Sequence, residues 1–252
     1  KILALRRKKV RDAERRFVIE GIRLAEEAIR SEAPVEQLVF CREMVEGDER
    51  LTRLREEATR REILVQETDR RAFRHMGESQ TPEGVLGVVQ MQAWDRSQVL
   101  DSAGAFVLLD RIRDPGNLGL ILRTAEAAGV GGIFISIGSV ELHNPKVVRA
   151  SRGSIFRVPA FRNQDLSPLL GELRNRSIQA LSAHVEGAPY HRVKPDERFA
   201  IILGNETFGI DPPLAAQADA SVTIPMVEGV DSLNVAVAAG ILLFRFLEQR
   251  LS

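Results

Sequence analysis

The stretch AFVLLDRIRDPGNLGLILRTAEAAG, residues 105–129, decides the fold of the second half of this chain. Its first five residues are all apolar, which predicts a strand buried on both faces. A polar loop follows, and the apolar spacing then predicts a helix over 118–128. Gly129 comes directly after that helix, at a position where glycine commonly ends one. A strand, a polar loop and a helix in this order form the unit of a parallel sheet covered by helices.

Two later segments repeat this order. The strand predicted over 199–203 runs into GNETFG, residues 204–209, and the strand predicted over 220–224 runs into Asp231-Ser232-Leu233-Asn234 and a helix predicted over 233–250. Because ligands of parallel α/β sheets bind beyond the carboxyl ends of the strands, we expect the three loops to form a site. Further strands are predicted over 132–137 and 178–182, and further helices over 144–150 and 166–176.

A separate α/β pattern precedes this half. The polar stretch around Trp94 divides the two halves. We therefore predict an N-terminal domain over 1–92, a linker over 93–103 and a C-terminal α/β domain over 104–252. In the N-terminal domain the pattern predicts strands over 35–40, 62–66 and 85–90, and helices over 17–29, 51–58 and 69–76.

The composition excludes several classes of protein. The 252 residues are 44% hydrophobic and 28% charged, which is typical of a globular chain with a substantial core. No apolar run reaches the roughly 18 residues of a membrane span. Cys41 is the only cysteine and the four histidines lack metal-ligand spacing, so we expect neither a disulfide framework nor a metal site. The basic first segment lacks an apolar signal core, and we expect a cytoplasmic protein without membrane contact.

Common nucleotide-binding and hydrolase motifs are missing from the sequence. No GxGxxG follows a predicted strand, and neither the GxxxxGK[ST] phosphate loop nor the GxSxG nucleophile turn occurs. Dehydrogenases, P-loop nucleotide hydrolases and α/β-hydrolases are therefore disfavoured.

Positive charge is concentrated in two segments, although the formal net charge is zero. Residues 1–23 contain nine Lys or Arg and three acids, and residues 142–164 contain five Lys or Arg and no acid. Phosphate binding needs a local positive face rather than a positive total. Each segment is therefore either a nucleic-acid-binding face or an ordinary solvated surface.

Single loop residues allow a structural and a functional interpretation. Gly204 would let a ligand approach the backbone closely. Ser232 suits the N-cap of the last helix, whereas Asn234 is a poorer helix former than its neighbours, which indicates a functional role. Arg123 taken alone indicates a surface or interface arginine, and Glu206 taken alone indicates a carboxylate favoured by a helix dipole.

Taken together, the three loop segments resemble the three motifs of the SpoU (TrmH-like) RNA 2′-O-ribose methyltransferases. The resemblance implies an α/β SPOUT domain, a parallel sheet with a deep trefoil knot made by the C-terminal segment. It also implies that the first half is a small RNA-binding domain akin to a ribosomal-protein fold. The segments that carry the resemblance are DRIRDPGNLGLILRTAEAAG (110–129), LGNETFGI (203–210), residues 224–234 with the following helix, the basic NPKVVRASRGSIFRVP (144–159) and, in the first half, FVIEG (17–21).

The resemblance also implies a reaction and a set of residues. S-adenosylmethionine would be bound in the knot and would donate a methyl group to a ribose 2′-OH. Arg123 is the family's proposed base, but a guanidinium normally stays protonated, so we favour a role in holding RNA phosphate and stabilising the forming alkoxide. The implied catalytic residues are Asn117, Arg123, Glu206, Ser232 and Asn234; the cofactor-binding residues are Ser182, Ala183, Gly204, Ile224, Met226 and Leu233; the RNA-binding residues are Lys8, Lys9, Arg11, Lys146, Arg149 and Arg152.

Partners and alternatives follow from the same resemblance. We expect a homodimer formed through the C-terminal domain, acting on RNA, with 23S ribosomal RNA favoured over tRNA. The alternatives are a tRNA 2′-O-methyltransferase and a non-catalytic RNA-binding or ribosome-assembly factor. Phe208, between Glu206 and Gly209, would either stack on a base or belong to the core. Housekeeping modification and antibiotic resistance by rRNA methylation both fit this reaction.

Overall fold

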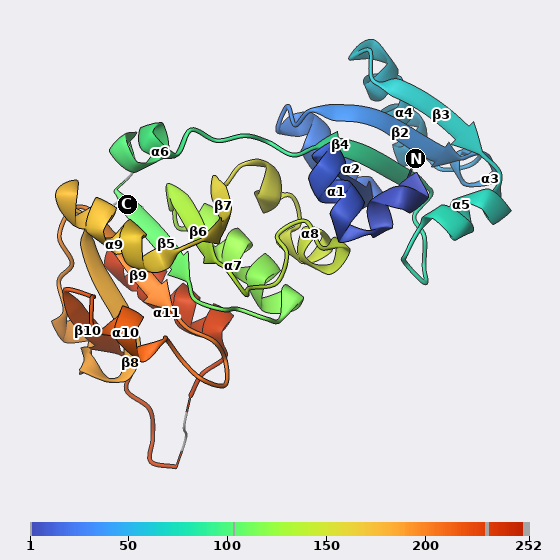
Figure 1. Cartoon of the computed structure of the whole chain (residues 1–252). Helices are drawn as coiled ribbons and strands as arrows, with labels where there is room; N and C mark the ends of the chain where they lie inside the picture. Colours follow the sequence, from blue (N-terminus) through green and yellow to red (C-terminus); the bar gives the residue numbers. More distant parts are fainter. Residues whose placement is uncertain (1, 103, 230–231, 249–252) are drawn as a thin grey trace. The chain divides into compact units, whose positions relative to one another are not determined.

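The chain divides into two compact units, which are described separately (Figure 1). The computed structural model describes residues 2–102, 104–229 and 232–248. Unit 1 comprises Lys1–Ala93 and His143–Phe156, and unit 2 comprises Trp94–Leu142 and Arg157–Ser252. Lys1, Asp231 and Arg250, which belong to segments discussed above, lie outside the described residues.

Unit 1 is built on a four-stranded sheet of mixed direction. Its strand order is β1-β4-β2-β3; β4 runs antiparallel to both neighbours, and β3 runs parallel to β2. One side of the sheet is closed by an apolar cluster that includes Leu5, Phe73 and Val88. The elements are η1 (Ile2–Arg6), α1 (Lys8–Glu14), β1 (Arg16–Glu20), α2 (Ile22–Arg30), β2 (Val35–Cys41), α3 (Arg42–Val45), α4 (Glu49–Arg60), β3 (Leu64–Thr68), α5 (Arg70–Met76) and β4 (Val85–Gln90).

The helix predicted over 17–29 is wrong in its first turn, because residues 16–20 form strand β1. Phe17 and Ile19 are buried while their neighbours are half-buried, and this alternation with period two belongs to a strand. Gly21, with φ 107°, separates the strand from helix α2. The two elements are too close in sequence for the apolar spacing to divide them.

The basic segment 143–156 groups with unit 1, although the sequence places it inside the C-terminal domain. It forms α8 (Pro145–Ser151) and η2 (Ser154–Phe156), and α8 packs against β1. The ring of Phe17 lies 4.7 Å from the ring of His143 and 6.4 Å from that of Phe156, measured between centroids. Aromatic packing of this kind anchors the segment on the first unit.

Unit 2 is built on a six-stranded sheet in which every pair of neighbours is parallel. The order is β10-β8-β9-β5-β6-β7, which confirms the predicted α/β class. The deep trefoil knot implied by the resemblance stays a prediction. The strands are β5 (Ala105–Leu109), β6 (Gly132–Ser136), β7 (Ala160–Gln164), β8 (Gln179–Pro189), β9 (Phe199–Leu203) and β10 (Ala220–Thr223); the helices are α6 (Arg96–Ser102), α7 (Pro115–Ala127), α9 (Leu166–Asn175), η3 (Tyr190–Arg192), α10 (Pro212–Ala215) and α11 (Val235–Leu247).

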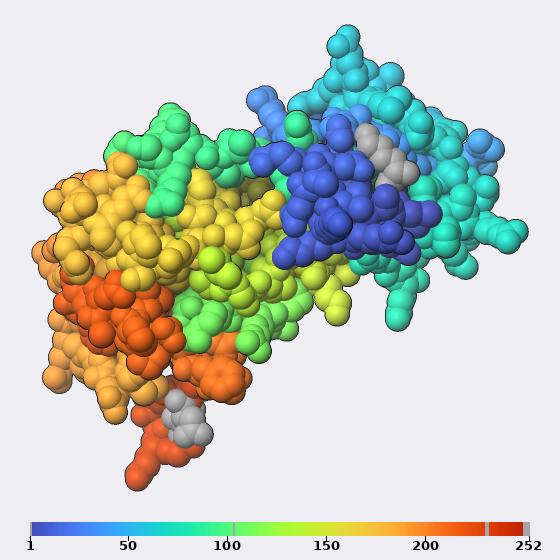
Figure 2. Space-filling model, viewed as in Figure 1, coloured from blue at the N-terminus to red at the C-terminus, as the bar shows by residue number. Residues whose placement is uncertain are grey.

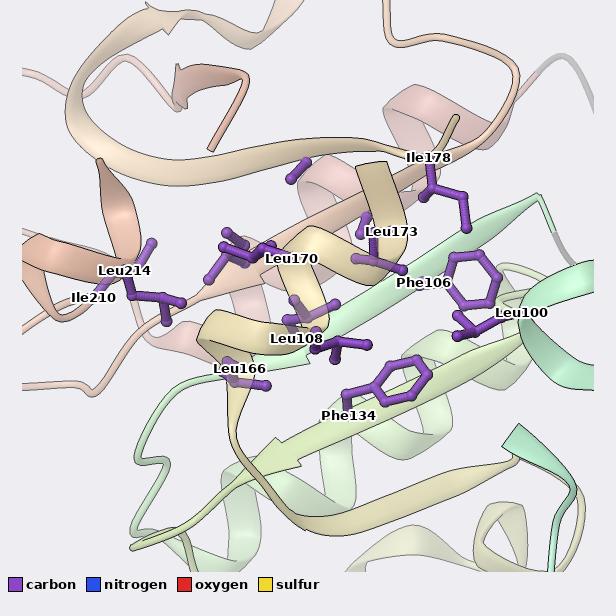
Figure 3. Packing of buried hydrophobic residues seen from close by; sticks show 14 residues of the cluster. Leu100, Phe106, Leu108, Phe134, Leu166, Leu170, Leu173, Ile178, Ile210 and Leu214 are labelled. Carbon is purple, nitrogen blue, oxygen red and sulfur yellow. The ribbon is translucent and has the colours of Figure 1, made fainter. Parts of the chain in front are cut away.

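The two faces of this sheet are covered by different helices. Side chains that alternate along β5, such as Phe106 and Leu108, pack under α9 in a fully buried cluster (Figure 3). Leu100 of α6 belongs to the same cluster, so the stretch expected as a linker contains a helix that contributes to the core. Helix α11 packs against α7, and its Phe246 ring lies edge-on to Phe199 of β9.

The register of the sheet brings two of the three loops together. Leu109 at the end of β5 pairs with Leu203 at the end of β9, and the two strands are parallel. The loops that follow therefore leave the sheet side by side at its carboxyl edge. The loop after β10, residues 224–229, stands out from the surface of unit 2 (Figure 2).

None of the helices that the structure describes is long and apolar enough to cross a membrane.

Candidate active site

Side-chain amides join the three loop segments of unit 2 in one hydrogen-bonded chain. Asn234 donates from Nδ2 to Oδ1 of Asn117 at 2.9 Å. Asn117 in turn donates from its own Nδ2 to Oε1 of Glu206 at 2.8 Å. The partners lie 117 and 89 residues apart in sequence, so the fold alone brings them together. We call Asn234, Asn117 and Glu206 the amide chain.

The direction of the amide chain is set by a helix cap. Oδ1 of Asn234 accepts from the backbone N–H groups of Ala236 and Val237, at 2.9 and 3.3 Å, and so caps α11. The prediction that Ser232 caps this helix is wrong, since Asn234 occupies the cap two residues later. With its oxygen engaged, Asn234 has only its N–H₂ group to offer Asn117. Each amide orientation then follows from the previous one, and Glu206 receives an N–H donor.

Asn117 is placed by the start of helix α7. Asp114 caps that helix by accepting from the Asn117 backbone N–H at 2.8 Å, and Pro115 occupies the first turn, where its missing N–H costs nothing. Asn117 is 8% exposed, whereas Glu206 is exposed. Asn234 is exposed as well, so the amide chain has a buried amide at its centre and an exposed residue at each end.

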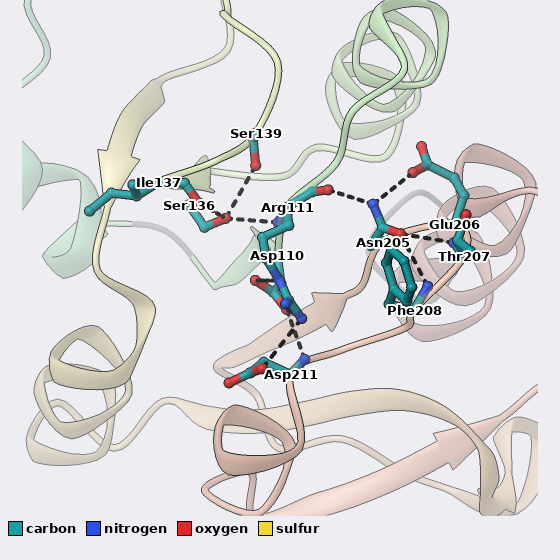
Figure 4. Close-up of polar contacts among 10 residues, drawn as sticks. All are labelled: Asp110, Arg111, Ser136, Ile137, Ser139, Asn205, Glu206, Thr207, Phe208 and Asp211. Atoms are coloured by element: carbon teal, nitrogen blue, oxygen red, sulfur yellow. Dashed lines mark hydrogen bonds and ion pairs between the residues drawn. The ribbon is translucent and has the colours of Figure 1, made fainter.

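Asn205 shapes the loop that carries Glu206 (Figure 4). Its Nδ2 donates to the backbone oxygen of Arg111 at 2.8 Å, and its Oδ1 accepts from the backbone N–H groups of Thr207 and Phe208. Its backbone also exchanges two hydrogen bonds with Gly209, at 3.0 and 2.9 Å. Asn205 is not among the site residues predicted from the sequence. The signal was an Asn directly after a strand and a glycine, a typical start of an Asx turn.

Gly204 has a structural reason to be glycine. A Cβ at this position would lie 2.2 Å from the carbonyl carbon of Gly209 and from the backbone nitrogen of Ile210. The loop therefore folds back directly over Gly204. The expected close approach is real, but the group that approaches this Cβ position is the chain's own backbone.

A second polar cluster holds the loop after β5 in place by hydrogen bonds. Asp110 is buried, accepts from the side chain of Arg111 and also accepts from the backbone N–H of Asp211 at 2.8 Å. The hydrogen bond with Asp110 raises the pKa of Arg111 above its ordinary value. Arg111 adopts a left-handed conformation, φ 54°, and its backbone N–H donates to Oγ of Ser136. This cluster was not predicted, and it ties the ends of β5 and β6 to the start of α10.

Arg123 and Ser232 do not join the amide chain. Both are exposed, and within the ranges that the structure describes neither side chain makes a hydrogen bond or ion pair. Glu206 and Arg123 are not paired, since the described hydrogen-bond donors of Glu206 are Asn117 and Asn205. Arg123 lies on α7, which also carries Asn117.

Comparisons with known proteins identify the family of the chain. Residues 104–244 match the model of the SpoU rRNA Methylase family, and residues 1–87 match that of the MRM3-like substrate binding domain. The chain belongs to the SpoU rRNA methylase family.

Individual SpoU relatives match over nearly the whole chain. The 23S rRNA (guanosine(2553)-2′-O)-methyltransferase RlmP of Bacillus subtilis (strain 168) is 33% identical over 241 residues, which cover 95% of this chain and 92% of RlmP. The 23S rRNA (uridine(2479)-2′-O)-methyltransferase of Streptomyces viridochromogenes is 31% identical over 271 residues, which cover 100% of this chain and 88% of that enzyme.

Solved structures of SpoU-type methyltransferases have the same fold. An AdoMet-bound rRNA methyltransferase from Sinorhizobium meliloti superposes with a TM-score of 0.84 and 30% identity, covering 100% of this chain and 94% of that chain. The SpoU methyltransferase AviRb from Streptomyces viridochromogenes, in complex with AdoMet, superposes with a TM-score of 0.86 and 26% identity. The match covers 100% of this chain and 96% of that chain.

Of the residues expected to hold S-adenosylmethionine in this SpoU chain, some follow the ends of β9 and β10. Ser182 and Ala183 instead lie within β8, where its pairing with β9 stops, because this strand continues to Pro189 rather than ending at residue 182 as predicted. Ile224 and Met226 are half-buried, and Leu233 is 37% exposed, so apolar surface remains available beyond β10. Ala183 is half-buried at the same edge, and Ser182 is buried, with Oγ bonded to Oγ of Ser221 at 3.1 Å. A partly open apolar wall beside backbone groups fits an adenine and its methionine chain. Among the described residues no His, Cys, Asp and Glu cluster could hold a metal.

The residues expected to bind RNA fall on two helices of unit 1. Lys8 and Lys9 are exposed on α1. Lys146, Arg149 and Arg152 follow one another along α8 and its C-cap, and none of their side chains has a hydrogen-bond partner within the part of the chain described.

Arg11 departs from this expectation. It is only 4% exposed, and its Nη1 donates to the backbone oxygens of Leu5 and Arg6 at 2.8 and 2.7 Å. These hydrogen bonds satisfy the backbone carbonyl groups at the C-terminal end of η1. We therefore correct its assignment from RNA binding to a structural role.

Proposed function

We propose that this SpoU chain transfers a methyl group from S-adenosylmethionine to a ribose 2′-OH of RNA, with 23S ribosomal RNA as the substrate. The amide chain carries the proposal, because it joins one residue from each of the three loops and presents the Glu206 carboxylate to solvent. A fold kept only for binding RNA would not need an exposed carboxylate held from a helix cap. The rRNA 2′-O-methyltransferases of similar sequence support the substrate class.

The residues of the chain have separate tasks in this reaction. S-adenosylmethionine, when bound, supplies a methyl group on a positively charged sulfur. Oε2 of Glu206 accepts a hydrogen bond from the ribose and so orients the 2′-OH. Asn117 holds the carboxylate in this position through Nδ2. Arg123, whose guanidinium has no described partner, binds the neighbouring phosphate and stabilises charge on the 2′ oxygen as its proton passes to solvent.

The active form is a homodimer formed through unit 2. Large apolar side chains remain exposed on the two packed helices α7 and α11: Leu120 at 44%, Val237 at 51% and Phe244 at 44%. Such a patch on a two-helix surface suits a second copy of the same chain, because a two-fold contact is self-complementary. Arg123 lies on α7 too, so a partner would cover the same region.

Phe244→Glu should give a monomer by light scattering, with Leu64→Glu as an exposed control in unit 1. An active wild-type monomer contradicts this part.

The test is transfer of labelled methyl from S-adenosylmethionine to separated rRNA and tRNA, followed by mapping of the modified ribose. Arg123→Ala should abolish transfer while RNA binding persists, and Arg123→Lys separates charge from guanidinium geometry. Methyl found on a base contradicts the mechanism. Label on tRNA alone selects the tRNA alternative. A wild type that binds RNA and methylates none would be a non-catalytic binding factor.

A further inference from the structure

Phe208 is an aromatic side chain left open to solvent beside the proposed active site. It is 72% exposed, whereas most phenylalanines of the chain are buried. The structure therefore excludes the core role that the sequence left open. Among the described residues no other ring stacks on it. A single exposed apolar residue is ordinary on a protein surface, so its meaning depends on how the loop holds it.

The loop holds the Phe208 backbone firmly. The Phe208 N–H donates to Oδ1 of Asn205 at 3.1 Å, and Asn205 is itself buried and bonded to Arg111. The two hydrogen bonds between Asn205 and Gly209 close the loop on either side of the ring. Figure 4 shows the ring on the same short loop as Glu206. The ring is thus presented from a fixed base, at a low cost in conformational entropy on binding.

The position of the ring relative to Glu206 suits a nucleotide. Two residues of chain span at most about 7 Å between Cα atoms, so the ring projects from the same short stretch of loop as the carboxylate proposed to orient the ribose. A 2′-OH is open to in-line attack when its nucleotide is drawn out of a helix or lies in a single strand. The base then loses its stacking partners, and an aromatic side chain replaces one of them.

We propose that Phe208 is a stacking platform for a base of the RNA substrate, either the base of the methylated nucleotide or that of its direct neighbour. The proposal rests on the proposed function and adds a residue that positions the nucleotide. Since every base has a flat face, the platform favours an unpaired nucleotide over a paired one and discriminates little among the four bases.

Phe208→Ala is the first test. Stacking on an aromatic side chain is worth about 1–3 kcal/mol per base, which corresponds to about 5- to 150-fold in kcat/KM. We expect this loss to appear in KM for RNA, with the Kd for S-adenosylmethionine and the Tm unchanged. Phe208→Tyr should retain activity, and Phe208→Leu, which is apolar but not flat, should not. Leu64→Ala, which removes a 54% exposed side chain from unit 1, is the matched control and should behave as wild type.

A fluorescence experiment detects the stacking itself. Trp94 is the only tryptophan, so Trp94→Phe combined with Phe208→Trp places a single reporter on the loop. Stacking on a base should quench its emission as RNA is added. Unquenched emission at saturating RNA, wild-type kinetics of Phe208→Ala, or weakened S-adenosylmethionine binding would each overturn the proposal. If the wild type methylates RNA and Phe208→Ala does so equally well, this proposal alone is refuted. If the wild type shows no methyl transfer, the proposed function is refuted.

Discussion

Polar side chains serve different purposes in the two units. In unit 1 they form Arg–Glu pairs at the surface, such as Arg16–Glu36 and Arg50–Glu26, between residues 20 and 24 positions apart. Unit 2 also has such surface pairs, for example Arg96–Glu172, but in addition its neutral amides of Asn117 and Asn234 form hydrogen bonds across 89 and 117 positions. An ion pair at the surface tolerates many geometries, whereas an amide with both groups engaged has one orientation.

This difference shows where each unit needs precision. Unit 2 fixes a carboxylate from a helix cap, which suits a reaction that depends on the position of one hydroxyl. Unit 1 neutralises many of its charges by pairing and leaves Lys8, Lys9, Lys146 and Arg149 of α1 and α8 without a described partner, which would suit binding to a flexible phosphate backbone. Substitutions in unit 2 should therefore change kcat, and substitutions in unit 1 should change affinity or stability by smaller amounts.

The largest effect is expected from Gly204→Ala. The added Cβ would meet backbone atoms of Gly209 and Ile210 at 2.2 Å, and no side-chain rotation relieves a backbone clash. We expect destabilisation of about 3 kcal/mol, the upper end of overpacking costs, together with loss of methyl transfer. Gly171→Ala in α9, where a Cβ meets nothing within 4 Å, is the control and should be neutral or slightly stabilising. Thermal unfolding and transfer assays decide, and a stable, active Gly204→Ala would refute the loop geometry.

Breaking the amide chain at its centre should come next. Asn117→Asp keeps the Oδ1 acceptor for Asn234 but turns an oxygen toward Glu206, so the carboxylate loses its donor. A misplacement of about 1 Å at an active site costs about 100-fold in rate, and we expect a loss of that size in kcat, with KM for S-adenosylmethionine little changed. Asn117→Ala should lose the same activity and about 1–3 kcal/mol of stability, because it removes two hydrogen bonds of a buried side chain, each worth about 0.5–1.5 kcal/mol. Steady-state kinetics measure both; wild-type kcat in Asn117→Asp would show that Glu206 needs no fixed donor.

Asn234 allows the cap and the site to be separated. Asn234→Asp retains the oxygen that caps α11 and removes only the donor to Asn117. It should keep the wild-type Tm and lose activity. Asn234→Ala removes both functions and should also lose about 1 kcal/mol of stability. If Asn234→Asp is as unstable as Asn234→Ala, the helix does not depend on this cap.

The cations of unit 1 should affect RNA affinity alone. Replacing Lys8 and Lys9 by Ala should lower the slope of log affinity against log salt by about 0.7 for each phosphate of single-stranded RNA that the protein no longer neutralises, with kcat at saturating RNA unchanged. Arg53→Ala is the matched control, because Arg53 is an exposed arginine of α4 already paired with Glu49. Filter binding over a salt series measures the slope. An unchanged slope in the double variant would remove α1 from the RNA surface.

The sequence predicted what local pattern determines and missed what distant contacts determine. Strands such as β5 and β9 follow from apolar runs, and the site loops follow from their polar ends. The cap could not be read correctly, because Ser232 and Asn234 both suit an N-cap and the choice depends on Asn117, more than 100 residues away in sequence. Arg11 carries the same charge as its exposed neighbours, and only burial beside Leu5 makes it structural. The grouping of 143–156 with unit 1 depends in the same way on its packing against β1.

The smallest effect is expected from an ion pair of unit 1. The hydrogen bond from Arg50, followed by its charge, lowers the pKa of Glu26 below its ordinary value. The pair therefore stabilises the fold fully above the unfolded carboxyl pKa of about 4.3, and its contribution is lost as pH falls through the lower, folded value. Because the pair is near the surface, Glu26→Gln should lower the free energy of unfolding by only about 0.2–1 kcal/mol at pH 7. At a pH below the folded pKa of Glu26, the substitution should not change it. Denaturant unfolding at both pH values measures this, with Glu56→Gln, an exposed glutamate without a described partner, as the control. A loss in Glu26→Gln as large as that of Asn117→Ala would erase the contrast between the units, since surface charge would then matter as much to the fold as the amide chain.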